Sequence, residues 1–107
     1  MRVISQDGTM DFPYEISTIF IHPRIGSVIE IQSAGDSEIS IIARYSSREK
    51  ALKAMEMLRR AYENNMFYHC MANTKRFEEA QNILSVEQFR KATAERFQFP
   101  KDDEIEV

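Results

Sequence analysis

The side chains that could carry out catalysis are few in this sequence. It contains two histidines and one cysteine. His69 and Cys70 are adjacent, so they would point to opposite faces of a strand or about 100° apart on a helix, which makes them a poor catalytic dyad. The sequence also lacks a set of metal ligands at a recognisable spacing and a glycine-rich phosphate-binding loop. It therefore predicts a protein that is not an enzyme, needs no metal or cofactor, and works by binding.

Arginine and aromatic side chains offer a different chemistry, the recognition of a small anion. A guanidinium group can hold two phosphate oxygens at once, and an aromatic ring can stack on a base. Helical spacing places Arg59 beside Met55 and Tyr62, at the border of an apolar stripe, so we expect it to be partly buried. Two interpretations stay open. Its stem could cross the core while its head meets a carboxylate, which is the more common arrangement, or it could face a ligand in a pocket or subunit seam.

Two further groups of residues are candidates for the same role. Arg24 follows a rigid proline at a strand turn, although an ordinary polar turn would also explain it. Arg96 stands beside Phe97 and close to Phe99 near the end of the chain. Burial of both phenylalanines in the core is the simpler explanation there, and base stacking is the functional alternative.

Composition sets limits on the class of protein. The 107 residues are 43% hydrophobic and 29% charged, which predicts one folded domain over residues 1–107. The formal net charge of −3 argues against duplex nucleic acid as a partner. A lone cysteine and the lack of a signal peptide or a long apolar run predict a cytoplasmic protein with no membrane contact. Seven Phe, six Met and four Tyr are many apolar groups for a small domain, so we expect a homo-oligomer.

The elements that must position these residues predict an α+β fold. Residues 1–45 are rich in strand-forming residues, and glycines mark the breaks between apolar runs. Asp7 and Gly8 predict a hairpin turn, and Pro13 predicts the end of the following strand. We expect four or five strands in one antiparallel meander.

A long helix should follow the meander. Ser46 and Glu49 have the spacing of a capping box, and from Arg48 to Asn64 the residues favour helix without Gly or Pro. This predicts a central helix within residues 46–65, whose apolar stripe packs on the sheet. We expect residues 66–72 to be a connector, residues 73–96 to form one or two shorter helices, and residues 97–107 to form a short strand and an acidic tail.

Three segments resemble a known group of proteins: residues 1–15 (MRVISQDGTMDFPYE), 45–62 (YSSREKALKAMEMLRRAY) and 97–105 (FQFPKDDEI). They look like small proteins of phages and prophages of Gram-positive bacteria. This group is similar to the Thoeris anti-defence sponges, which sequester cyclic ADP-ribose signals without cleaving them. The resemblance implies a phage protein in the cytoplasm of an infected host. It also implies a cyclic ADP-ribose isomer or a cyclic oligonucleotide as the ligand, bound between the protomers of an oligomer.

The resemblance carries over to two candidate contacts, Arg59 in the matching helix segment and the C-terminal residues 97–100. In a sponge of this kind, Arg59 and Arg24 would neutralise phosphates. Phe97 or Phe99 would stack on a base of the ligand, and Asn73 or Gln98 would form hydrogen bonds with its polar edges.

One position departs from the group's pattern. Relatives often carry an arginine in the place of Gln98, which can donate only neutral hydrogen bonds. Arg96 or Lys101 could substitute for that arginine, or the ligand preference could differ.

Two other functions remain open. The protein could inhibit a host defence system by docking on one of its proteins, through the acidic tail or through exposed methionine and aromatic side chains. It could also be a small phage accessory protein with no role in defence evasion. The first alternative needs no small ligand, so capture of a protein partner would distinguish it from a sponge.

Overall fold

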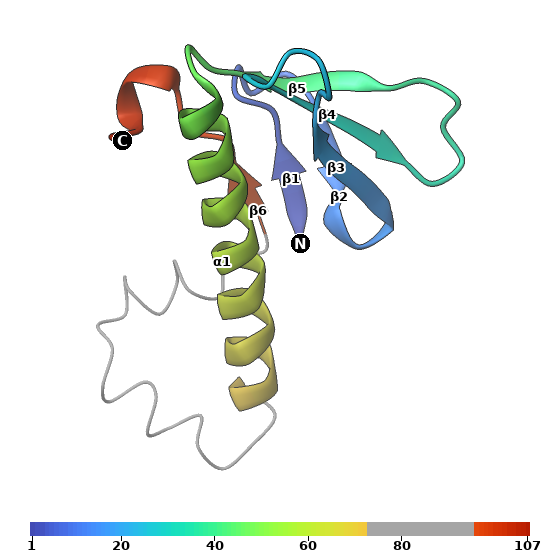
Figure 1. Cartoon of the computed structure of the whole chain (residues 1–107). Helices are drawn as coiled ribbons and strands as arrows, with labels where there is room; N and C mark the ends of the chain where they lie inside the picture. The colour runs from blue at the N-terminus through green and yellow to red at the C-terminus, as the bar shows by residue number, and fades with distance from the viewer. Residues whose placement is uncertain (73–95) are drawn as a thin grey trace.

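The computed structural model describes residues 1–72 and 96–107. These residues form an α+β structure with two three-stranded sheets and one long helix (Figure 1). The predicted fold class is therefore confirmed. The shorter helices expected after residue 72, and Asn73 with them, lie outside the described residues.

The first sheet joins the two ends of the chain. Strands β1 (Arg2–Ile4) and β2 (Asp11–Pro13) are antiparallel, and β6 (Arg96–Gln98) pairs in parallel with β1 on its other side. The predicted hairpin turn is confirmed. Gly8 has a φ of 78°, and the carboxylate of Asp7 accepts hydrogen bonds from the side chain of Ser5 at 2.6 Å and the backbone of Thr9 at 3.0 Å. A C-terminal strand is present, one residue earlier than expected.

The second sheet is an antiparallel meander of β3 (Ser17–Ile21), β4 (Val28–Ser33) and β5 (Ser40–Arg44), in the order β3-β4-β5. Five strands precede the helix, but the expectation of one meander is wrong because they belong to two sheets. Pro13 ends β2, and the 3-10 turn η1 (Tyr14–Ile16) redirects the chain before β3 begins. Proline has no N–H to extend a ladder, which explains the break at that point.

The helix α1 runs over Arg48–Ala72. It begins one residue later than the capping box predicts, because Ser47 rather than Ser46 accepts the backbone N–H of Lys50, at 3.2 Å. It also continues through residues 66–72, so the expected connector is wrong. Asparagine costs only a few tenths of a kcal/mol in a helix interior, and no Gly or Pro stops the helix after Asn64.

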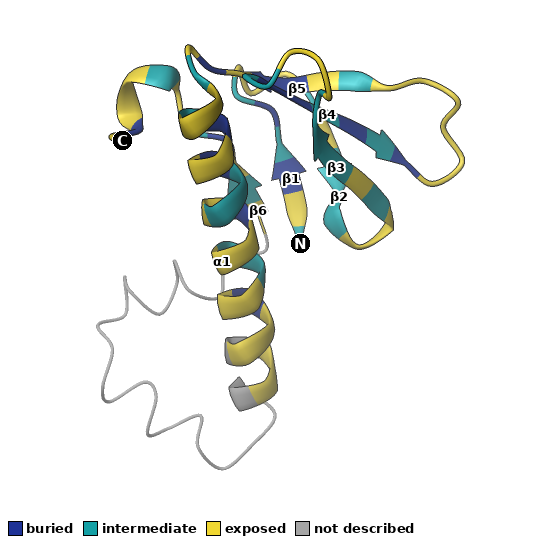
Figure 2. Cartoon of the chain, in the orientation of Figure 1, coloured by how far each residue is buried: buried dark blue, intermediate teal, exposed yellow. Residues whose placement is uncertain are grey.

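The hydrophobic core lies between the two sheets and the first half of α1, where buried residues gather in Figure 2, whereas most of the second half is exposed. The predicted stripe on α1 is confirmed for Ala51, Ala54 and Leu58, which are at most 1% exposed. The other core residues come from the strands, from Tyr45 directly after β5, and from the C-terminal segment: Val3, Ile29, Ile31, Ile42, Ala43, Tyr45, Phe99 and Ile105.

The C-terminal segment (residues 96–105) is tied to the rest of the fold by hydrogen bonds. The carbonyl of Pro100 accepts the hydroxyl of Tyr45 at 2.8 Å and the side-chain amide of Gln6 at 3.2 Å. The ammonium of Lys50 donates to the backbone carbonyl of Asp102 at 2.9 Å. The acidic stretch therefore begins as a second 3-10 turn, η2 (Asp102–Glu104), packed beside the start of α1. No helix in the described part of the chain is long and apolar enough to cross a membrane.

Candidate functional site

A cleft of about 440 Å³ opens between α1 and the strand side of the molecule. From α1 it is lined by Met55, Leu58, Arg59 and Tyr62, and from the other side by Tyr14, Glu15, Ser17 and Ile19. We call it the Arg59 cleft. Its walls come from segments more than 30 residues apart in the sequence, so the fold is needed to bring them together.

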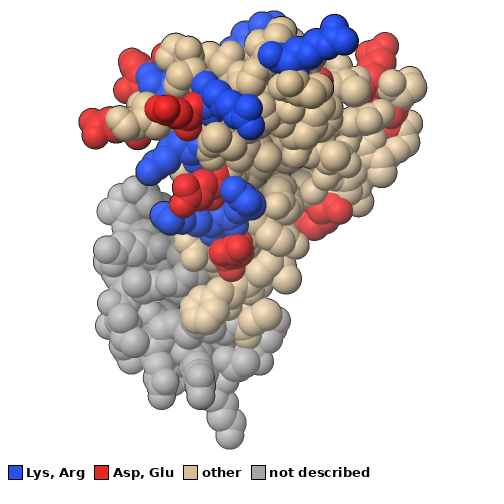
Figure 3. All heavy atoms as spheres, viewed as in Figure 1, with Lys and Arg blue, Asp and Glu red and all other residues tan. Residues whose placement is uncertain are grey.

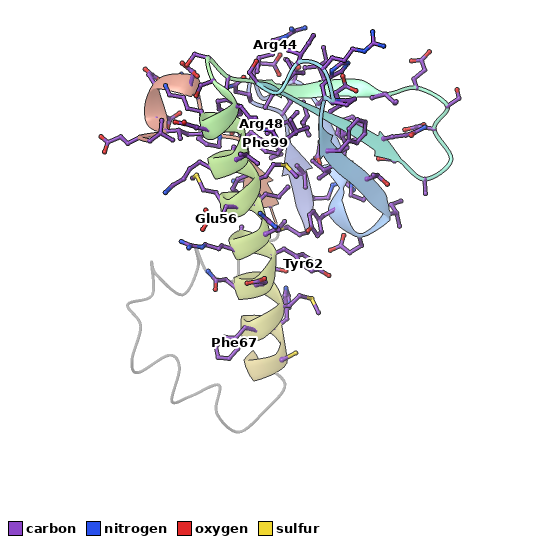
Figure 4. All side chains as sticks on the ribbon, in the orientation of Figure 1. Arg44, Arg48, Glu56, Tyr62, Phe67 and Phe99 are labelled. Atoms are coloured by element: carbon purple, nitrogen blue, oxygen red, sulfur yellow. The ribbon has the colours of Figure 1, made fainter. Side chains whose placement is uncertain are left out.

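Simple periodicity explains how both walls are arranged. Residues 55, 58, 59 and 62 are three or four apart and share one face of a helix. Ser17 and Ile19 alternate with Thr18, so their side chains share the inner face of β3. The turn η1 then carries Tyr14 to α1, where the Tyr14 and Tyr62 ring centroids are 4.4 Å apart with an interplanar angle of 34°. Figure 4 shows Tyr62 on the side of α1 that faces the strands.

Arg59 is the cation of this cleft. It is exposed rather than partly buried as expected, and within residues 1–72 and 96–107 it forms no salt bridge. Its neighbour Arg60 is different, because its guanidinium lies 2.7 Å from the carboxylate of Glu56 one turn earlier. The interpretation in which Arg59 crosses the core to meet a carboxylate is therefore not the one observed.

The acidic residue of the cleft already has a cationic partner. The carboxylate of Glu15 accepts a hydrogen bond from the α-ammonium of Met1, which lowers the pKa of Glu15. The hydroxyl of Ser17 donates to the carbonyl of Pro13 and lies 2.8 Å from the hydroxyl oxygen of Ser33. These groups are engaged inside the protein, so the guanidinium of Arg59 is the charge left without a partner among the described lining residues.

Tyr14 adds a neutral hydrogen-bonding group beside this charge. Burial raises its pKa, with a smaller contribution from Tyr62, whereas the nearby Arg59 acts in the opposite direction. Tyr14 therefore keeps its proton at neutral pH and can donate or accept a hydrogen bond. A guanidinium and two tyrosine side chains together can hold an anionic group and an aromatic ring of the same ligand.

The other basic candidates are not among the described residues that line the cleft. Arg24 is exposed in the turn between β3 and β4, where its backbone N–H donates to Nδ1 of His22 at 3.1 Å. Arg96 is exposed at the start of β6, opposite Arg2 of β1. Figure 3 shows lysine and arginine side chains interspersed with acidic ones along the visible face of α1. Of the three arginines, only Arg59 lines the cleft.

The C-terminal candidates split between the core and a second hollow. Phe99 is 1% exposed, so its ring has no free face for a base. Phe97 is half-buried and meets Phe99 edge to face, with centroids 5.3 Å apart. Gln98 is exposed and lines a hollow of about 300 Å³ together with Lys101 and Gln6. The simpler explanation, core burial, therefore describes Phe99 and part of Phe97.

Sequence reasoning missed the strand-side wall of the cleft. The spacing of Arg59 and Tyr62 was visible, but nothing near Tyr14 and Glu15 indicates that η1 would turn them towards α1. That contact depends on the break at Pro13 and on the separation into two sheets. A proline followed by two bulky polar residues was the one available signal.

Comparisons of the chain with protein-family models, with curated proteins and with solved structures found no match. Among residues 1–72 and 96–107, no three His, Cys, Asp or Glu side chains are grouped so that they could hold a metal ion.

Proposed function

We propose that this protein binds a small anionic ligand with an aromatic base in the Arg59 cleft and sequesters it without cleaving it. The observation that carries the proposal is a guanidinium without a salt bridge among the described residues, beside two tyrosine rings in a cleft of about 440 Å³. Small-molecule sites span roughly 300–1,000 Å³. Arg59 would hold a phosphate, and Tyr14 or Tyr62 would contact the base.

The chemistry of the cleft supports binding without turnover. Hydrolysis of a phosphate ester or anhydride needs a general base, a nucleophile or a metal ion at the reacting bond. Glu15 is held by the Met1 ammonium, and the Ser17 hydroxyl is committed to the carbonyl of Pro13. Neither histidine is among the residues that line the cleft.

The ligand class that we propose is a cyclic nucleotide immune signal, a cyclic ADP-ribose isomer or a cyclic oligonucleotide. The protein would then be a phage anti-defence protein acting in the host cytoplasm. The resemblance of residues 1–15, 45–62 and 97–105 to phage and prophage proteins supports this part. In this proposal the ligand is held by the residues of the Arg59 cleft. It does not need contacts from Arg24, Arg96 or the C-terminal candidates.

Self-association is also part of the proposal, and the outer edge of β3 supports it. The N–H of His22 donates to Val28 of β4 at 2.9 Å. Because alternate residues of a strand bond to the same neighbour, the backbone groups of Ile19 and Ile21 point away from β4. They form no backbone hydrogen bond among the described residues. The five residues of β3 contain no charge and no proline, the usual protections of an edge strand, so a second copy could pair there.

Light scattering during size-exclusion chromatography tests the association. Proline in place of Ile19 removes an N–H that β4 does not use, so the fold should survive while edge pairing is lost. Ile19→Val keeps that N–H and is the matched control. A wild-type protein that stays monomeric at high micromolar concentration would exclude this part of the proposal.

Binding is tested by thermal shift and calorimetry with a panel of cyclic ADP-ribose isomers and cyclic oligonucleotides. A ligand that binds only the folded state raises its melting temperature. Arg59→Ala should weaken binding by about 1.5–3 kcal/mol, the range for a hydrogen bond to a charged group. Arg60→Ala changes the adjacent arginine, which is paired with Glu56 on the outer face, and should leave binding intact.

Sequestration is tested by heating the complex and analysing the released ligand. Intact ligand is the expected result, and recovery of only degraded nucleotide would contradict a sponge. If no panel ligand shifts the melting temperature and a host protein is captured in stoichiometric amounts, the docking alternative replaces this proposal.

A further inference from the structure

The turn between β3 and β4 is built around an imidazole acceptor. Nδ1 of His22 accepts the backbone N–H of Arg24 at 3.1 Å and that of Ile25 at 3.0 Å. The other ring nitrogen, Nε2, lies 3.7 Å from the carboxylate of Glu30 in β4. The imidazole therefore accepts the backbone hydrogen bonds that an Asp or Asn side chain accepts in an ordinary turn.

These contacts define the charge of the ring in the closed turn. A nitrogen that accepts two N–H groups must keep its lone pair, so Nδ1 carries no proton. The ring is then neutral, and its single proton is on Nε2, facing Glu30. The closed turn and a doubly protonated ring are incompatible, because a proton on Nδ1 would face two donors.

We propose that protonation of His22 opens the turn that holds Arg24 and Ile25, which makes this end of the hairpin a pH-dependent switch. Histidine changes its charge between about pH 5 and pH 8. When Nδ1 gains a proton, both backbone hydrogen bonds are lost and the imidazolium is drawn towards Glu30. The closed turn belongs to higher pH and the open turn to lower pH.

The charges around the ring act in opposite directions. Glu30 in the adjacent strand favours the imidazolium. Arg24 in the turn itself disfavours it, and so does Arg44 of β5, which stands opposite Val28 in the same cross-strand row as His22. The carboxylate of Glu30 lies 3.7 Å from Nε2, so an imidazolium released from the turn would be drawn towards it.

The switch would change how the side chains of the turn are exposed to solvent at this end of the sheet. Ile25 is 54% exposed while its backbone is held, and Arg24 is held by the same ring. Opening releases the backbone N–H groups of Arg24 and Ile25, while the carbonyl of Ile25 can still accept the N–H of Val28, a bond of 3.1 Å in the closed turn. The inference is independent of ligand binding in the Arg59 cleft, and either can fail without the other.

Nitrogen-15 NMR of the full chain from about pH 8 to about pH 5 tests the switch. At high pH the Nδ1 resonance should be that of an unprotonated acceptor, and the Arg24 and Ile25 amides should be protected from hydrogen exchange. Their protection factors should fall by about tenfold or more on acidification, as expected when hydrogen bonds of this kind are lost. The fall should share the midpoint of the His22 ring.

The His22 amide is the internal control, because it donates to Val28 at 2.9 Å and should stay protected if only the turn opens. Protection of Arg24 and Ile25 that persists while the His22 ring titrates would overturn the proposal. So would loss of all three amides together, which is global unfolding.

Two variants test the His22 ring and the neighbouring carboxylate separately. His22→Asn offers an acceptor that does not titrate, so the Arg24 and Ile25 amides should stay protected over the whole range. Glu30→Gln removes the carboxylate beside Nε2 and leaves the Nδ1 acceptor in place, so the Arg24 and Ile25 amides should stay protected at high pH. An unchanged pH-dependent loss in His22→Asn would assign the transition to another group and reject the switch.

Discussion

In the Arg59 cleft, a guanidinium group and two tyrosine rings line an open volume, whereas in the C-terminal segment the polar groups are bound to the fold itself. The Pro100 carbonyl accepts two side-chain hydrogen bonds, and Asp102 is held by Ser46 and Lys50. Both regions combine basic and aromatic side chains. The comparison indicates that a binding site is marked by charge left without an internal partner, and not by residue type alone.

The largest expected effect is that of truncating Phe99, whose side chain is buried in the core and not exposed to a ligand. Because its side chain is 1% exposed, Phe99→Ala should lower the free energy of unfolding by about 3–5 kcal/mol, the range for a buried phenylalanine. Urea denaturation followed by circular dichroism measures this value.

Phe97→Ala is the matched control for that experiment. Phe97 is only half-buried, so its truncation should cost clearly less. If both variants unfolded equally easily, or if Phe99→Ala kept its stability and lost ligand affinity, the C-terminal segment would be a binding surface after all.

In the Arg59 cleft, Tyr62→Ala removes an aromatic ring that lines the cleft and is not part of the main core. We expect ligand affinity to fall by about 1–3 kcal/mol, the range for loss of a base stacked on an aromatic ring. The unfolding free energy should change less than in Phe99→Ala. Calorimetry with the ligand selected from the panel gives the affinity.

Tyr62→Phe keeps the ring and should retain most of that affinity. If Tyr62→Ala bound normally while Arg59→Ala did not, the cleft would hold an anion but the base would lie elsewhere.

Local sequence signals predicted the elements better than their assembly. The Asp7 and Gly8 turn, the stripe of Ala51, Ala54 and Leu58, and the late strand before Pro100 all follow from neighbouring residues. The division into two sheets does not, because β1 pairs with β6 from the far end of the chain and nothing local specifies that partner. The helix α1 continues beyond Asn64 because asparagine is only a weak signal for a helix end and the residues on both sides of it favour helix.

The candidate site shows the same limit. Helical spacing placed Arg59 beside Met55 and Tyr62, and that half of the cleft is observed. The other half depends on η1 folding towards α1, which is a tertiary event. Core burial was the simpler explanation for Phe99, and it is confirmed for that residue. The residues that surround Phe99 in the core come from distant parts of the chain, so local sequence does not specify them.

A smaller effect is expected from the hydroxyl that fastens the C-terminal segment. Tyr45→Phe removes the hydrogen bond to Pro100, 2.8 Å long, and should cost about 1 kcal/mol of stability. Burial also raises the pKa of Tyr45, so its stabilising contribution is present below the tyrosine value of the unfolded chain, about 10, and is lost as pH rises above it. The variant should therefore lose less stability than the wild type in alkali. Equal losses above pH 10 would show that Tyr45 does not govern this region.

The smallest effect concerns Asp102 at the start of α1. The backbone N–H of Ser46, at 2.7 Å, and the side chain of Lys50 lower the pKa of Asp102. A lowered pKa means that the stabilisation is present above the unfolded aspartate value of about 3.9 and disappears as pH falls through the folded value. Asp102→Asn should remove that part of the acid dependence of the unfolding free energy.

Asp7 is the reference for the Asp102 experiment, because hydrogen bonds from Ser5 and Thr9 lower its pKa to about 2 in the hairpin turn, at the other end of the chain. Asp7→Asn should remove acid sensitivity between about pH 4 and about pH 2 while the ties between Asp102 and α1 persist. If Asp102→Asn left the acid profile unchanged and Asp7→Asn flattened it, Asp102 would contribute no acid-sensitive stability. The C-terminal segment would then be held by Phe99 and Tyr45, through packing and a neutral hydrogen bond, and its contrast with the charged cleft would be sharper still.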